Sequence, residues 1–422
     1  MLKAFRKLWN DRRGNALVIA GAALPLVVGA AGLATDTIQW ALWKRQIQRA
    51  ADSAALAGVY DRIANDSSTS NVAAAVADDL GRHNHTNIPL LAGYPEIDYP
   101  TGTNWTNPVR VELALQRTLG FSSLFMSSAP VITTRATAAT VSTGVYCVVS
   151  LVNTSETGIK ATGNGDINLG CGMITNSTSL TAAIATGSSK VTATPVAAVG
   201  DIQDSPNWGG AELLPFTVKQ NDPYADVEPD TSMCAASPPK FEVKKNKPLP
   251  PLPAAGATTC FSEMSIDGPI TLNPGTYIID GGNLDFGSST NLTCDGCTFV
   301  LTNSDPADDA TIGQITNFNS TIELHLSAPD DSANPYDGIL FYQDRRAEPG
   351  FQTINGNSLS VLEGAFYFPT QELKINGTAG LQFKCAQFVS WIVDFAGNAG
   401  LTNTCSDYGD NEIMGKHVRL VA

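Results

Sequence analysis

Charged side chains are scarce in this 422-residue chain, at 16% of the residues, against about 25% in an average soluble domain. Basic residues are scarcer still, because 26 lysines and arginines face 40 aspartates and glutamates, which gives a net charge of −14. General nucleic-acid binding requires a basic surface, so this charge balance disfavours a nucleic-acid-binding protein. Hydrophobic residues reach 43%, which is too many for a disordered chain.

The local signatures of three large enzyme classes are also missing, since no GxxxxGKS/T, HExxH or GxSxG occurs. There are only 4 histidines. His83 and His85 could supply two metal ligands, but no third ligand follows at a helical or strand spacing, so a solvated helix end is the simpler interpretation. We therefore predict a non-enzymatic protein with no catalytic, cofactor or metal site.

What the chain does contain is an uncharged stretch from Ala16 to Ala34. As a helix it would be about 28 Å long, which matches the hydrocarbon core of a bilayer. A cleaved secretory signal is the alternative, but its apolar region is usually shorter and no polar break follows here. The predicted membrane anchor contains Ala16, Leu17, Val18, Ile19, Leu24, Pro25, Leu26, Val27, Val28 and Leu33.

Charges and aromatic residues flank this stretch unequally. Five cations precede it within 1–14, and three follow it within 44–49. Trp40 and Trp43 suit the far membrane interface, where indole rings concentrate. The distribution predicts a single-pass protein of the bacterial inner membrane, with a cytoplasmic N-terminus and a periplasmic body.

Cysteine usage agrees with that compartment. All eight cysteines lie beyond residue 140, and an even number is typical of an oxidising environment. Eight cysteines allow 105 pairings, and short loops favour the neighbouring pairs Cys147–Cys171, Cys234–Cys260, Cys294–Cys297 and Cys385–Cys405. The 294–297 pair has the CxxC spacing of redox and zinc centres, but its strand-like flanks and the lack of a second CxxC favour a structural bond.

The segment around the anchor has an ordered motif: a basic start, a Gly-Asn step, the apolar span, an aspartate and an alanine-rich helix. The residues that carry it are Arg12, Arg13, Gly14, Asn15, Asp36, Gln46, Ala50, Ala51, Asp52, Ala54, Ala55 and Leu56. It resembles the N-terminus of the TadE/TadG-like proteins of Flp (tight adherence) pilus assembly. Processed prepilin-type chains usually have Glu five residues after the glycine, but Ile19 stands there. We therefore expect a retained anchor rather than cleavage after Gly14.

The resemblance implies a component of Flp pilus assembly or surface adhesion whose N-terminal helix contacts the inner membrane and pilin-like proteins. Some TadG-type proteins carry a von Willebrand A domain with a metal-binding DxSxS motif. Asp66, Ser68 and Ser70 have that spacing but follow a helix, and Asn153 stands where a metal-binding aspartate would be expected in 147–158. We expect no such domain.

Four segments are predicted: a basic cytoplasmic head (1–14), a transmembrane and continuing helix (15–60), a small α+β pilin-like segment (61–142) and a β-rich body (143–422). In the third segment, a helix within 71–84 is expected to stop at Gly81, followed by extended runs over 110–115 and 131–141, with a helical turn at 121–125 between them.

The body is predicted to be a parallel β-solenoid. Gly356, Gly377 and Gly397 recur at intervals of 21 and 20 residues within short β-branched runs, a period typical of stacked rungs. A β-sandwich with Asn-Gly hairpins is the alternative. A proline-rich excursion at about 205–262 interrupts the pattern.

Acidic turns in the body leave two further hypotheses open. Carboxylates on adjacent loops can bind Ca²⁺, and a pair such as Asp305 with Asp330 could be the general acid and base of a polysaccharide-active enzyme. No calcium-binding repeat is present, so solvated turns are favoured; a secreted adhesin is another alternative. The turns contain Asp305, Asp308, Asp309, Asp330, Asp331, Asp407 and Asp410.

Overall fold

A computed structural model of the protein describes residues 13–83, 89–307, 311–356, 358–377, 381–397 and 400–421. Several residues of the sequence predictions lie outside these ranges, namely residues 1–12 of the basic head, including Arg12, together with His85, Asp308 and Asp309. For 13–17, His83 and Asp410 only the backbone is described. The chain divides into two compact units, one up to Val141 together with the segment from Val418, the other Ser142–His417.

The first unit is built on one long helix, α2 (Arg13–Ala64), which joins the apolar span to the alanine-rich segment without a break at Pro25. It ends where Asp66 and Ser67 adopt positive φ angles of 48° and 66°, a left-handed conformation that stops a helix. A second helix, α3 (Val72–His83), continues through Gly81. The predicted stop at Gly81 is therefore wrong, because that glycine keeps an ordinary helical φ and nothing crowds it.

A small antiparallel sheet packs against the second half of α2. It consists of β1 (Glu96–Asp98), β2 (Trp105–Gln116) and the first part of β3 (Val131–Ser150). The loop between β2 and β3 contains the short 3-10 helix η1 (Ser122–Leu124), at the predicted helical turn. Gly58 lets the helix approach the sheet, since a Cβ there would lie 2.8 Å from Val109 Cγ1.

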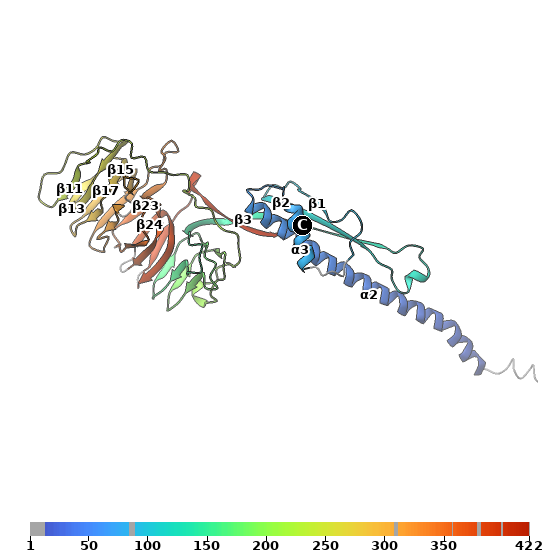
Figure 1. Cartoon of the computed structure of the whole chain (residues 1–422). Helices are drawn as coiled ribbons and strands as arrows, with labels where there is room; N and C mark the ends of the chain where they lie inside the picture. The colour runs from blue at the N-terminus through green and yellow to red at the C-terminus, as the bar shows by residue number, and fades with distance from the viewer. Residues whose placement is uncertain are drawn as a thin grey trace, which may run out of the picture. The chain divides into compact units, whose positions relative to one another are not determined.

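The second unit is a parallel β-solenoid, which confirms the predicted fold class (Figure 1). Its strands pair in parallel through three faces, which excludes the sandwich. The middle face stacks β10 (Leu213–Leu214), β9 (Val196–Ala198), β6 (Gly172–Thr175), the end of β3, β24 (Leu381–Gly397), β23 (Val361–Gly377), β21 (Ile339–Gln343), β18 (Cys297–Thr302), β15 (Gly275–Asp280) and β12 (Ala257–Phe261).

Two further faces complete each rung. One stacks β8 (Lys190–Thr192), β5 (Asp166–Asn168), β25 (Leu401–Thr404), β24, β23, β20 (Glu323–Ser327), β17 (Asn291–Cys294) and β14 (Pro269–Thr271). The other stacks β7 (Ala183–Ala185), β4 (Ile159–Ala161), β24, β23 and β22 (Gly350–Ile354), followed by β19 (Ile315–Thr316), β16 (Leu284–Phe286), β13 (Glu263–Asp267) and β11 (Lys240–Lys244). The other elements among the described residues are η2 (Pro206–Trp208), η4 (Gly409–Asn411) and β26 (Ile413–Leu420).

The stacking order differs from the chain order. The rungs of 146–214 extend in one direction from the middle of the stack, and the chain then restarts at β11 at the other end and returns rung by rung. The two parts join where β24 pairs with β3 and β4, through Phe388↔Val148 and Val393↔Ile159. One continuous core results, although the strands that meet at this join are far apart in the sequence.

An aromatic column fills this core. Tyr277, Phe299, Phe341, Phe366 and Phe388 come from successive rungs, with neighbouring ring centroids 5.3–5.6 Å apart. The alternate side chains of the same strands point outward, yet they are also buried. A second layer must therefore cover this face.

That layer is the strap (residues 215–236), which crosses the rungs of the middle face. Thr217 N–H donates to Ala198 O at 2.9 Å, Tyr224 O–H donates to Gln387 Oε1 at 2.6 Å, and the Cys234–Cys260 bond joins the strap to β12. The predicted excursion at 205–262 is thus only partly irregular. It also contains β10, β11 and β12, which are short strands of the stack itself.

Candidate functional site

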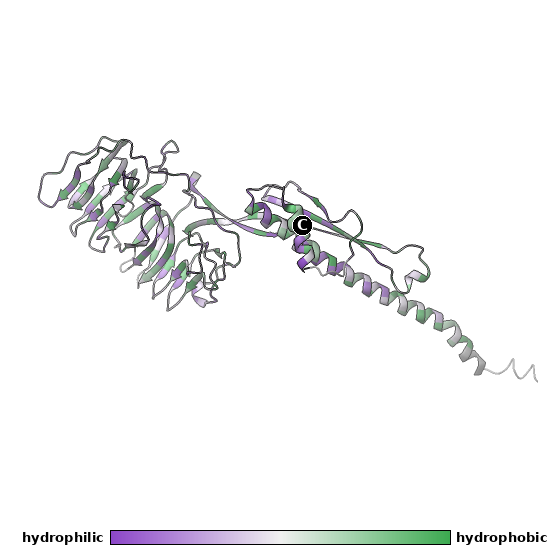
Figure 2. Cartoon of the chain, in the orientation of Figure 1, coloured by the Kyte–Doolittle hydropathy of each residue, from purple (hydrophilic) through white to green (hydrophobic). Residues whose placement is uncertain are grey.

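The N-terminal part of α2 presents an exposed apolar surface. None of its most apolar 18-residue window is buried, and the helix is long and apolar enough to cross a membrane. Figure 2 shows apolar residues along the part of α2 that extends beyond the β2–β3 loop. Leu24, Leu26 and Val27, all of the predicted anchor, are exposed. Burying a large apolar side chain away from water contributes about 1.5–3 kcal/mol, and side chains exposed to water in this way would lack that contribution.

Burial begins at Asp36, directly after the span. Only 3% of this residue is exposed, and a buried carboxylate requires hydrogen-bond donors. The donors are backbone amides of the β2–β3 loop: Phe121 N–H at 3.0 Å from Oδ1, and Ser122 N–H at 2.5 Å from Oδ2. Asp36 therefore fastens the loop to the helix at the end of the apolar span.

Further along α2, small residues of the motif form the buried face. Ala50, Ala51, Ala54 and Ala55 are buried together with Ile47 and Val59, and this face packs on the sheet and on α3. Asp52 accepts a hydrogen bond from Gln48 Nε2 at 2.8 Å, and the same nitrogen also donates to Arg135 O at 3.0 Å. Gln46 is exposed and Leu56 half-buried. Most of the motif thus serves packing within the first unit.

All eight cysteines are paired in the structure. The bonds are Cys147–Cys171, Cys234–Cys260, Cys294–Cys297 and Cys385–Cys405. Cys294 and Cys297 are buried at the adjoining ends of β17 and β18. Their surroundings are strands rather than the helix N-terminus that would activate a redox thiolate.

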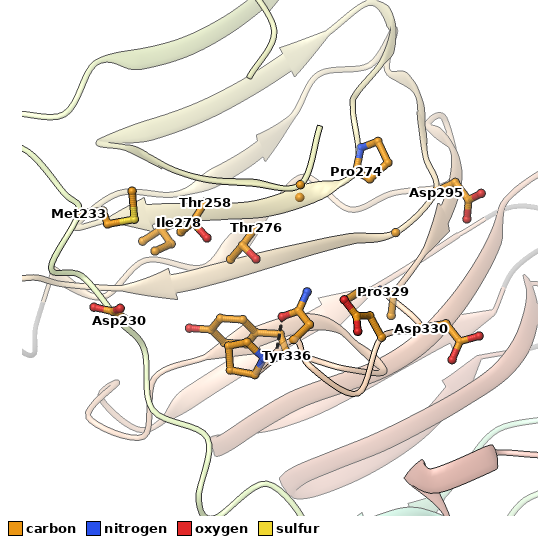
Figure 3. A pocket seen from close by; sticks show the side chains of 17 residues that line it. Asp230, Met233, Thr258, Pro274, Thr276, Ile278, Asp295, Pro329, Asp330 and Tyr336 are labelled. Carbon is orange, nitrogen blue, oxygen red and sulfur yellow. Dashed lines mark hydrogen bonds between the residues drawn. The ribbon is translucent and has the colours of Figure 1, made fainter. Parts of the chain in front are cut away.

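A cleft of about 600 Å³ lies beside the solenoid face, between the rungs and the loop 328–336 (Figure 3). The strap contributes Asp230 at one end, and Asp295 and Asp330 line the other end. Asp331 completes the set of carboxylates, and no lysine or arginine is among the lining residues. The cleft is therefore acidic and suits a cationic group better than an anionic one.

The structure does not bring together the carboxylate pair suggested by the sequence. Asp330 lines this cleft and a neighbouring one of about 490 Å³ that also contains Glu363 and Asp407, whereas Asp305 lines neither. Asp305 Oδ1 instead accepts the amide of Ala307 at 2.9 Å. Ser68 and Ser70 of the DxSxS spacing bond to each other in an exposed turn, and Asn153 is exposed. Within the described residues, no three His, Cys, Asp or Glu side chains group as metal ligands do.

A cluster on the strap escaped the sequence analysis because its members lie far apart in the chain. Tyr367 O–H donates to Asp222 Oδ2 at 2.7 Å and accepts from Arg345 Nε at 2.9 Å. Arg345 also pairs with Glu228 at 2.6 Å. Burial, together with the bond to Asp222, raises the pKa of Tyr367 far above its ordinary value. This cluster clamps the strap onto the rungs.

Residues 14–66 match the family of putative Flp pilus-assembly TadE/G-like proteins. The match covers nearly all of α2 and confirms the resemblance found in the sequence, for this segment. Comparison with curated proteins and with solved structures finds no match.

Proposed function

We propose that this protein is a non-enzymatic, single-pass component of Flp-type pilus assembly or pilus-dependent attachment. The α2 span would cross the bacterial inner membrane with its basic start in the cytoplasm, and the solenoid would act in the periplasm as a scaffold or binding surface. The observation that carries the proposal is the match at 14–66, which falls on a helix whose apolar window is wholly unburied.

The disulfides support the periplasmic placement of the body. Four bonds lie in the second unit, and such bonds persist in oxidising compartments. A β-rich stack closed by a strap and four bonds suits a rigid scaffold outside the cytoplasm. Pilin-like proteins are the expected partners of α2, through the face that the small sheet leaves uncovered.

A clean deletion tests the function. Loss of surface pili or of attachment, restored by the full-length gene, is the expected result. A second strain carries a variant in which Leu24 and Val27 are replaced by lysine, which places two charges in the span at about 2.5–3.5 kcal/mol each. Both side chains are exposed in the structure, so the variant changes no buried residue. This variant is expected to fail in complementation, and normal piliation of the deletion strain would contradict the proposal.

The proposal that the protein is not an enzyme has a separate test. We expect the purified chain to leave uronic-acid polymers intact. Turnover that is lost when Asp330 of the acidic cleft is changed to asparagine would establish the polysaccharide-active alternative instead.

A further inference from the structure

The loop between β2 and β3 has a tip that exposes large apolar side chains. Leu124, Phe125 and Met126 are 74%, 77% and 47% exposed. The ring of Phe121 lies 5.4 Å from that of Phe125 and extends the same apolar surface. Contiguous apolar surface of this kind on a soluble protein marks a site that something else covers.

The tip is held at one level of α2. Two backbone N–H groups of the loop donate hydrogen bonds to Asp36. In addition, the ring of Phe121 lies against Gly32, where a Cβ would come within 2.3 Å of Phe121 Cδ2. Gly32 is therefore the residue type that this contact requires. The tip lies beside the last turn of the apolar span, which ends at Ala34 (Figure 1).

Aromatic and basic side chains follow on the far side of the tip. The Lys44 ammonium lies 5.2 Å from the Trp40 ring, and the Arg117 guanidinium lies 5.4 Å from the Trp43 ring. Along the helix the order is thus apolar span with apolar tip, then indoles, then cations. This is the order in which hydrocarbon, interface and anionic headgroups occur at a membrane surface.

We propose that the β2–β3 tip is a second membrane contact, in which Leu124, Phe125 and Met126 insert into the leaflet where the α2 span ends. The inference rests on the proposed anchoring of α2. The bilayer is the occupant because the tip continues the unburied surface of the span and shares its level, with the tryptophans and cations beyond it. Two contacts fix the tilt of the helix in the bilayer and hence the orientation of the first unit, which the span alone would leave free.

Site-specific fluorescence in lipid nanodiscs tests this contact on the full-length chain. Because every native cysteine is paired, Phe125→Cys supplies the one reactive thiol for an environment-sensitive dye. Leu26→Cys in the span is the embedded control. Leu180→Cys in the solenoid is the matched control, since that residue is 77% exposed, as Phe125 is.

The quencher is a nitroxide attached to phosphatidylcholine near the headgroup or deep in the chain. We expect the label at 125 to be quenched several-fold more by the shallow nitroxide than the label at 180, and the label at 26 to respond to the deep one. Quenching at 26 with 125 behaving like 180 would overturn the inference and leave the anchoring intact. Absence of quenching at both 26 and 125 would overturn the membrane contact of the tip and the proposed anchoring of α2 together. A label at 125 that is shielded from water but unquenched by lipid indicates a protein partner and also contradicts the inference.

Discussion

At the scale of single residues, Asp36 has the clearest structural task. Its carboxylate accepts two backbone amides of the β2–β3 loop, 85 and 86 residues away in the chain. Family resemblance singled out this aspartate, but the sequence could not show its partner, because nothing local links residue 36 to residues 121 and 122. The pairing follows only from the way the sheet folds back along α2.

Removing this carboxylate is expected to free the loop. Asp36→Ala leaves the amides of Phe121 and Ser122 without their acceptor. Hydrogen exchange at Phe121 and Ser122 should accelerate about tenfold or more in detergent micelles. Asp52→Ala, which removes only the contact with Gln48, serves as the control and should leave both rates unchanged. Equal effects of the two variants would contradict the role given to Asp36.

Buried tyrosines predict an alkaline limit to the stability of the solenoid. Burial raises the pKa of Tyr277 and Tyr336 to about 12, from an ordinary value of 10.0. Above pH 10 the unfolded chain releases these protons while the folded chain keeps them, so the free energy of unfolding falls as the pH rises. Below pH 10 the contribution is fully present.

Urea unfolding of the full-length chain between pH 8 and pH 11 checks this expectation. The midpoint should fall above pH 10, and Tyr277→Phe should reduce the decline by removing one of the titrating groups. A midpoint that stays constant to pH 11 would contradict the burial assigned to these hydroxyls.

At the scale of elements, the strap explains why outward-facing residues of the middle face are apolar. Ile278, Val300 and Tyr342 point away from the core, yet they are buried under or beside the strap. The recurring glycines predicted the solenoid because such positions stack on one another: Gly397 of that series lies so close to Gly163 that a Cβ on Gly163 would come within 2.5 Å of Gly397 O. Glycines that stack in this way recur at a regular interval that can be recognised in the sequence. The strap has no repeat, so the sequence does not reveal that it covers this face.

Opening the Cys234–Cys260 bond is expected to loosen the strap. The bond closes a loop with a separation of 26 residues, and its removal costs about 3.5 kcal/mol by loop-closure entropy. In a variant with both cysteines changed to serine, limited proteolysis should cut within 222–236 before any rung. The comparison variant lacks Cys385 and Cys405, a bond with a separation of 20 that does not touch the strap, and it should be cut elsewhere. Identical cleavage of the two variants would refute the strap's dependence on its disulfide.

At the scale of the whole molecule, features that rest on local sequence patterns could be predicted, and features that rest on long-range pairing could not. The long apolar helix, the pairing of neighbouring cysteines and the solenoid period follow from local patterns, and the structure reproduces each of them. The meeting of β24 with β3 and β4 could not be predicted, since parallel rungs of similar composition can stack in either order and only long-range packing selects one. The acidic cleft could not be predicted either, because Asp230 and Asp330, which line it, come from segments a hundred residues apart.

Protease protection in spheroplasts tests most directly whether a lipid-embedded α2 holds a body that lies outside the cytoplasm. The chain carries an epitope ahead of Met1, and protease is added to intact spheroplasts and, separately, to lysed ones. We predict that intact spheroplasts lose the body while the epitope survives on a short fragment in the alkali-resistant membrane pellet, and that lysis exposes the epitope as well. A body that resists protease until lysis, or a full-length chain in the soluble fraction, would contradict the proposed topology.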